Sequence, residues 1–281
     1  MPRIVFHCAS HYANPCALPV DEFTECIERL LDLHQYISST GEPIFKDEEV
    51  YEAEIQPGLL VWQLLYENHG SILSRDNIKL LQLALDQARQ STSVVLAQAT
   101  IQGSLGPFSN AQANKLENYG DWYNLVRKSL ATEPQELTAF CENFRAAFPR
   151  LIFSDAFPNC INTFDGGYKR YSRTLVHCLS ALNDHWQWDG GDLTQYLRAF
   201  SAQSNVSTTQ EGNGDRKPAL TFHFKAENDC LEAVLCEPHM KLTQSDVPGD
   251  NTFYFHRVYF YPRAHVTFQG KLLIGHAGEH L

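Results

Sequence analysis

The sequence predicts an α+β protein with a mainly helical N-terminal region, a few strands, and a C-terminal antiparallel β meander. Apolar residues at helical spacing recur through most of residues 1–203, whereas short alternating segments follow residue 218. A polar stretch over 204–217 separates the two patterns. We therefore expect a helical α+β region over 1–203, a linker or mobile loop over 204–217, and a β-rich module over 218–281.

The N-terminal region opens with a short strand at 4–6 and an amphipathic helix over 20–37 that places Phe23, Ile27 and Leu30 on one side. A second clear helix over 75–90 follows the capping residue Ser74. The apolar run 59–66 fits either a helix or a buried strand. Further helices are expected over 111–130, 134–147, 168–186 and 192–200, and strands over 44–45, 50–55, 94–101 and 151–153.

The C-terminal module reads as strands over 220–225, 230–237, 239–242, 253–261 and 271–275. Because side chains alternate between the two faces of a strand, six apolar residues should be buried together on one face. These are Met240, Leu242, Val258, Phe260, Leu272 and Ile274.

Composition narrows the classes of function. The chain has 281 residues and a formal net charge of -11, which disfavours broad adhesion to nucleic acid. Its eight cysteines are scattered without a CxxC pair, as expected of reduced thiols in the cytoplasm. Apolar runs are too short for a signal or a membrane span, so we expect no membrane partner. No P-loop or GxSxG motif is present in the sequence.

The other face of the C-terminal strands carries the candidate catalytic residues. His239, Lys241, Arg257 and Tyr259 share that face, and His276 ends the last strand. Cations of this kind can stabilise phosphate charge while His or Tyr moves protons, which suits RNA cleavage without a metal or other cofactor. Substrate contacts would come from neighbouring Tyr261, Arg263 and Lys271. Half-exposed strands also favour Tyr and Arg for structural reasons alone.

The residue order supports a resemblance. His239-x-Lys241, then Arg257-x-Tyr259-x-Tyr261, Gly270 and His276 resemble the C-terminal half of RelE/HigB/ParE-type bacterial toxins, which are small α+β ribonucleases or gyrase poisons. The resemblance implies that Arg257 holds the phosphate, that Tyr259 or Tyr261 contacts a base, and that His276 or Lys241 handles protons. The acidic charge and the long region ahead depart from that pattern. As a whole, the chain resembles bacterial defence or toxin-like proteins.

The run from His276 to His280 formally spells the zinc motif H-x-x-E-H. Gly278 disfavours a helix there and the run directly follows a strand, so we expect no metal site. The sequence thus predicts an effector-type, metal-independent nuclease acting on RNA in a toxin or anti-phage context, restrained by a protein partner or inhibitor. The alternative is a non-catalytic subunit that docks a partner protein in a defence or regulatory complex.

Overall fold

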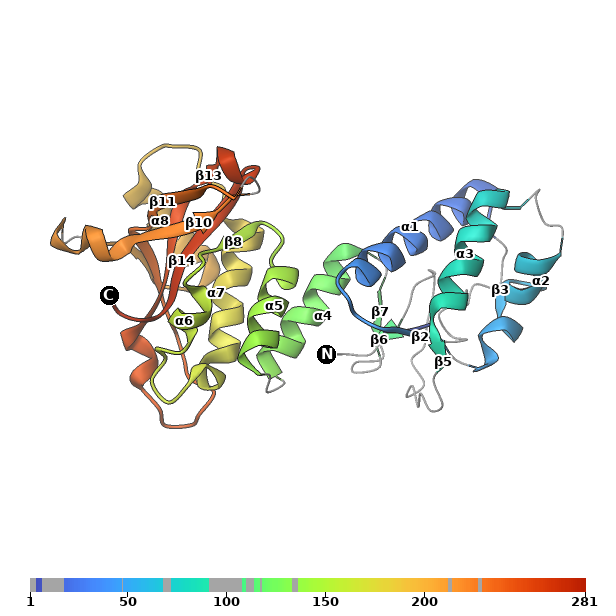
Figure 1. The fold of residues 1–281 in the computed structure, drawn as a ribbon, viewed down its shortest axis with the longest axis horizontal. Helices are drawn as coiled ribbons and strands as arrows, with labels where there is room; N and C mark the ends of the chain where they lie inside the picture. The colour runs from blue at the N-terminus through green and yellow to red at the C-terminus, as the bar shows by residue number, and fades with distance from the viewer. Residues whose placement is uncertain are drawn as a thin grey trace. The chain divides into compact units, whose positions relative to one another are not determined.

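The computed structural model describes residues 4–6, 18–46, 48–67, 72–90, 108–109, 114–116, 118–132, 136–211, 214–226 and 229–281. It confirms the α+β class (Figure 1). The chain divides into two compact units, residues 1–126 and 127–281, with the division inside helix α4 (Tyr119–Thr132). This boundary differs from the expected linker at 204–217. The strand expected over 94–101 lies outside the described residues.

The first unit, residues 1–126, is built on a mixed sheet with strand order β5-β2-β1-β6-β7. Strands β1, β2 and β5 are parallel, so right-handed crossovers place α1 and α3 on one face of the sheet, where they pack side by side (Figure 1). The elements are β1 (Ile4–Phe6), α1 (Val20–Ser39), β2 (Ile44–Lys46), β3 (Glu54–Gln56), β4 (Leu59–Leu60), α2 (Val61–Tyr66), α3 (Arg75–Gln87), β5 (Arg89–Gln90), β6 (Phe108–Ser109) and β7 (Asn114–Lys115).

Helices α1 and α3 form where the apolar spacing predicts them. The α1 helix buries the predicted stripe, including Phe23 and Ile27, and carries acidic residues in its first turn. The Ser74 hydroxyl caps α3 by accepting a hydrogen bond from the Asn77 amide at 3.1 Å.

Three other expectations in the first unit are adjusted. The apolar run at 59–66, for which either a helix or a buried strand was expected, contains both, because strand β4 leads directly into helix α2. The strand expected over 50–55 is a 3-10 turn, Glu48–Glu52, followed by β3, which pairs with β4. The helix expected from residue 111 begins at Tyr119.

The second unit, residues 127–281, contains a sheet with strand order β8-β14-β13-β12-β9. Of the five strands of the predicted meander, β12, β13 and β14 pair antiparallel in this sheet, whereas β10 and β11 pair with each other in a separate two-stranded sheet. Strand β8 adds a parallel edge strand beside β14. The elements are α5 (Leu137–Ala147), β8 (Leu151–Phe153), α6 (Phe157–Ile161), α7 (Ser172–His185), α8 (Leu193–Ser204), β9 (Thr208–Gln210), β10 (Thr221–Lys225), β11 (Leu231–Leu235), β12 (Pro238–Lys241), β13 (His256–His265) and β14 (Lys271–Glu279).

Part of the expected linker belongs to this sheet. Strand β9 lies within 204–217 and pairs with β12. Its two threonines, Thr208 and Thr209, are good strand formers that the overall polarity of the segment conceals. The segment therefore supplies an edge strand of the second unit.

The apolar face of the meander is buried as predicted. Met240, Val258, Phe260 and Ile274 are 0% exposed, and the two remaining predicted residues are also buried. Phe260 packs edge-to-face on Trp186, which follows α7, with ring centroids 4.8 Å apart. This face of the sheet is therefore packed against residues of the helical layer.

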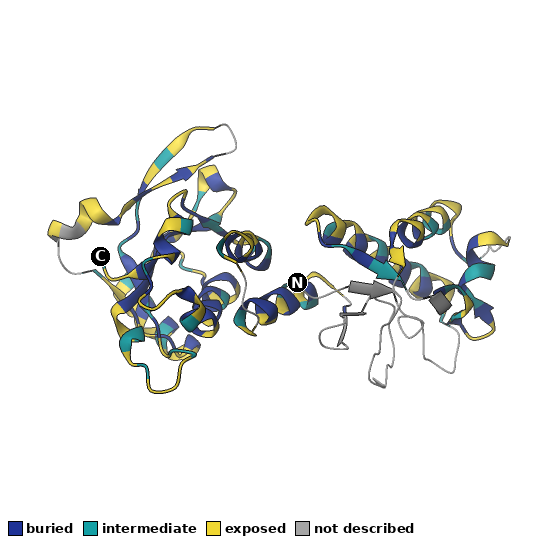
Figure 2. Cartoon of the chain, turned by 60° about the horizontal axis from the view of Figure 1, so that its bottom comes forward, coloured by how far each residue is buried: buried dark blue, intermediate teal, exposed yellow. Residues whose placement is uncertain are grey.

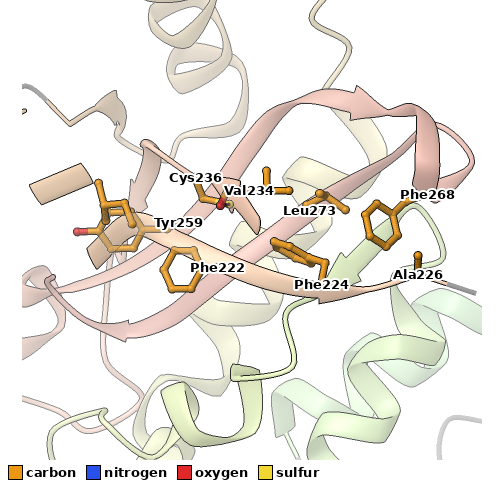
Figure 3. Close-up of a cluster of buried hydrophobic side chains, with 9 residues drawn as sticks. Phe222, Phe224, Ala226, Val234, Cys236, Tyr259, Phe268 and Leu273 are labelled. Atoms are coloured by element: carbon orange, nitrogen blue, oxygen red, sulfur yellow. Dashed lines mark hydrogen bonds between the residues drawn. The ribbon is translucent and has the colours of Figure 1, made fainter. Parts of the chain in front are cut away.

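The opposite face of the meander is also packed, against the two-stranded β10–β11 hairpin. Alternation in β10 points Phe222 and Phe224 inward, between exposed neighbours. Figure 3 shows these rings beside Tyr259 and Leu273, which come from β13 and β14. The buried cluster consists of Leu220, Phe222, Phe224, Ala226, Val234, Cys236, Tyr259, Phe268 and Leu273. The hairpin thus covers the part of this face that carries Tyr259 and Leu273.

Candidate functional site

Three predicted site residues form a row across three adjacent strands. Strand register places His239 of β12 opposite Tyr259 of β13, and Tyr259 opposite His276 of β14. The ring centroids are 5.1 Å apart for His239 and Tyr259, and 5.8 Å apart for Tyr259 and His276. We call these three residues the histidine row. The expectation that His239 and Tyr259 share a face agrees with this register, whereas His276, expected at the end of the last strand, lies within β14.

The histidine row is buried. His239, Tyr259 and His276 are 5%, 0% and 4% exposed, because the β10–β11 hairpin packs over Tyr259 and His276. The Phe222 ring stacks on the His276 ring with centroids 6.2 Å apart (Figure 3 shows Phe222 next to Tyr259). The catalytic roles expected of these residues require an accessible face, and this face is buried because the apolar side of the hairpin packs on it.

Internal partners hold the row in place. The His239 Nε2 atom lies 3.1 Å from the Thr209 hydroxyl, and the His276 Nε2 atom lies 2.9 Å from the backbone oxygen of Glu279. The Tyr259 hydroxyl accepts a hydrogen bond from the Leu281 amide at 3.3 Å. These contacts orient all three rings within the unit.

Burial also sets the charge of the two histidines. Desolvation, with a smaller contribution from the positive charge of Arg257, lowers the pKa of His239 to about 4. Desolvation likewise lowers the pKa of His276 to about 4, although the hydrogen bond to Glu279 opposes the shift. Both rings are therefore neutral at pH 7 and lack the second ring proton that an imidazolium releases as a general acid.

Arg257 is directed at the backbone of its own chain. Its guanidinium donates hydrogen bonds to the backbone oxygens of Tyr254 and His256, and the residue is 9% exposed. Burial lowers the pKa of Arg257. Lys241 lies opposite Arg257 in the register and is half-buried. The two cations are neighbours, but the guanidinium already has acceptors within the fold.

The three expected substrate contacts do not join the histidine row. Lys271 begins β14 and pairs with His265, at the end of that strand opposite His276. Tyr261 is half-buried against the His265 ring, at a centroid distance of 5.6 Å. Arg263 is exposed and stacks over Trp188, 5.0 Å from the ring centroid. These three residues therefore lie on or near β13 and β14 but away from the histidine row.

The residues of the H-x-x-E-H run also lie in extended structure. His276 and Glu279 are part of β14, which agrees with the expectation that this run does not form a helix. Among the described residues, no group of three or more His, Cys, Asp or Glu side chains has a geometry that could hold a metal ion.

A surface that was not predicted lies between α1 and α3 in the first unit. Here Leu80 and Leu83 of α3 are 50% and 51% exposed, and Figure 2 shows exposed and buried positions alternating around both helices. The depression between the helices has a volume of about 350 Å³, and we call it the α1–α3 groove. It is lined by Leu31, Asp32, His34, Gln35, Ser38, Leu80, Leu83, Ala84 and Gln87.

The sequence contained a signal for this groove. Within α3 the apolar positions are 78, 80, 81, 83, 84 and 85, which cover more than the single face needed for packing. Only Leu81, Ala84 and Leu85 of α3 are buried. The core therefore does not bury Leu80 and Leu83, and apolar side chains left exposed side by side are a sign of a contact surface.

Comparison of the chain with protein-family models, curated proteins and solved structures finds no significant match. Among the residues described, no helix combines the length and apolar character needed to cross a membrane.

Proposed function

We propose that this protein is a non-catalytic subunit that docks a partner protein through the α1–α3 groove. The observation that supports this proposal is the half exposure of Leu80 and Leu83 on adjacent turns of α3, beside Leu31 of α1. Apolar side chains that line a groove between two helices are typical of a surface that receives an amphipathic helix.

The packing of the second unit also favours docking over catalysis. A catalytic group must reach its substrate within hydrogen-bonding distance, and a general acid or base works best with a pKa near the working pH. The β10–β11 hairpin covers Tyr259 and His276, His239 is 5% exposed, and the two imidazoles have pKa values of about 4. In this arrangement the sheet completes the fold of the second unit.

A selection from a random peptide library tests docking and does not require an identified partner. The full chain would be immobilised, and enrichment would be compared with that of a Leu80→Asp/Leu83→Asp variant. A Leu231→Asp variant is the matched control, since Leu231 is 60% exposed on the hairpin of the other unit. We expect enrichment by the native chain and the control and its loss in the double variant. Equal enrichment by all three proteins would contradict docking at the groove.

A second candidate function is metal-independent cleavage of RNA by the histidine row with Arg257. The specific observation in its favour is that His239, Tyr259 and His276 are brought into line across three strands, with Arg257 two residues before Tyr259 on β13. This function requires the β10–β11 hairpin to move away and expose the row.

The nuclease candidate is tested by incubating the full chain with RNA in the presence of EDTA. Native protein would be compared with Arg257→Ala and His276→Ala after their thermal stabilities have been measured. Cleavage by the native chain that falls a hundredfold or so in a variant that remains folded would favour this candidate. Absence of cleavage, or equal cleavage by all three proteins, would remove it.

A further inference from the structure

We infer that the partner element that fills the α1–α3 groove is a basic amphipathic helix. This inference rests on the proposed docking function and adds the chemistry of the occupant. It draws on three features of the described residues: the four apolar residues among the nine that line the groove, its two parallel walls, and the charges beside it.

The shape of the groove suits a helix. Residues 31, 35 and 38 of α1 lie one turn apart along one wall, and residues 80, 83 and 87 of α3 form the same spacing along the other. The two helices run in the same direction because each connects parallel strands. A third helix laid between them would bury apolar residues on successive turns against Leu31, Leu80, Leu83 and Ala84.

The charges beside the groove select a basic occupant. Helix α1 carries five acidic residues, Asp21, Glu22, Glu25, Glu28 and Asp32, against one basic residue, Arg29, and Asp32 lines the groove itself. Helix α3 adds Asp76 and Asp86, which flank the two leucines, and the basic residues Arg75 and Lys79, so the two helices together carry seven acidic against three basic residues. Lysine or arginine on the flanks of the occupant would be attracted to this surface, whereas an acidic helix would be repelled.

The packing below the groove makes it a preformed surface. Leu81 and Leu85 of α3 are 2% and 1% exposed, and Ile27 and Leu30 of α1 are 0% and 5% exposed. The Asn77 side-chain amide donates a hydrogen bond to the Glu28 carboxylate at 3.1 Å, which joins the two helices directly. A rigid groove loses little conformational entropy on binding, so the binding of a short helical peptide can be used to detect it.

The test uses a designed peptide as the probe. A fluorescein-labelled peptide of about five helical turns carries leucine at helical spacing on one face and lysine on the flanks. Its binding to the full chain is followed by fluorescence anisotropy at about 50 mM and about 300 mM NaCl. We expect saturable binding that weakens at the higher salt concentration.

Three variants locate the binding. Leu83→Asp should weaken it about tenfold or more, because the buried leucine contact is replaced by an unpaired charge. Asp86→Asn should weaken it a few-fold and reduce its salt dependence. Leu231→Asp, on the surface of the other unit, should leave it unchanged. Circular dichroism confirms folding, which these exposed positions should tolerate.

Two further peptides separate the outcomes. A scrambled peptide of the same composition should bind at least tenfold more weakly, and a peptide with glutamate in place of lysine should bind more weakly still. Equal binding of the acidic peptide, no binding of the basic one, or binding unaffected by Leu83→Asp would overturn the inference. Docking itself would survive if the library selection still depends on Leu80 and Leu83. A native dimer that Leu83→Asp dissociates would instead make a second copy of this chain the occupant.

Discussion

The β10–β11 hairpin should be an integral part of the second unit. The loss of unfolding free energy caused by Phe224→Ala measures how much the hairpin contributes to the stability of that unit. Phe224 is 0% exposed and its ring lies against Phe268, with centroids 6.1 Å apart. Replacing a fully buried phenylalanine with alanine removes apolar contacts and leaves a cavity, which typically costs about 3–5 kcal/mol. We expect a loss in that range, since the hairpin core is continuous with Tyr259 and Leu273 of the main sheet.

Urea unfolding followed by far-UV circular dichroism would measure this loss. Phe255→Ala is the matched control, because Phe255 is 57% exposed and its removal should change the unfolding free energy by about 0.5 kcal/mol or less. If Phe224→Ala cost less than about 1 kcal/mol, the hairpin would contribute little to the unit, which would refute a stable cover over the histidine row.

Two other predictions concern the same face. Because the pKa values of His239 and His276 fall from 6.5 to about 4 on folding, the unfolded chain binds more protons below about pH 6.5, and the unfolding free energy should fall by about 2 kcal/mol per histidine by about pH 5. Urea unfolding midpoints at about pH 7 and at about pH 5 measure this loss, and a His239→Gln/His276→Gln variant should lose much of this pH dependence of stability. Gly275→Ala should cost about 1–3 kcal/mol in a thermal melt, because its new methyl group would overlap the Phe222 ring. Gly191→Ala, whose methyl group would meet the Asp189 carboxylate at 3.8 Å, should change the melt little.

Local patterns predicted much of the fold. Helical spacing located α1, α3 and α7, and period-two alternation assigned Val258 and Phe260 to the core. These features depend on neighbours within one element, which a sequence displays directly. The parallel pairing of β8 with β14 depends on residues far apart in the chain, and local periodicity carries no information about it.

The alternation in β13 assigned residues to two faces without revealing what covers each one. Tyr259 and Arg257 have polar ends, so their face reads as accessible, although their apolar atoms can pack in a core. The inward Phe222 and Phe224 of β10 required a partner surface, and that surface is the face that carries the candidate site. The residues of the row could be predicted, while their burial depended on how a separate hairpin docks.

Thiol labelling tests most directly whether the candidate catalytic face is covered. Cys236 is 0% exposed within the hairpin cluster, where burial also raises the pKa of its thiol, whereas Cys230 is exposed just before β11. The folded chain would be treated with iodoacetamide and each cysteine followed by peptide mass spectrometry, with a sample in urea as the fully accessible control. We expect rapid modification of Cys230 and modification of Cys236 only as the whole unit unfolds. Comparable rates at the two cysteines in the folded chain would show that the hairpin opens readily, which would contradict the covered face and favour the nuclease candidate.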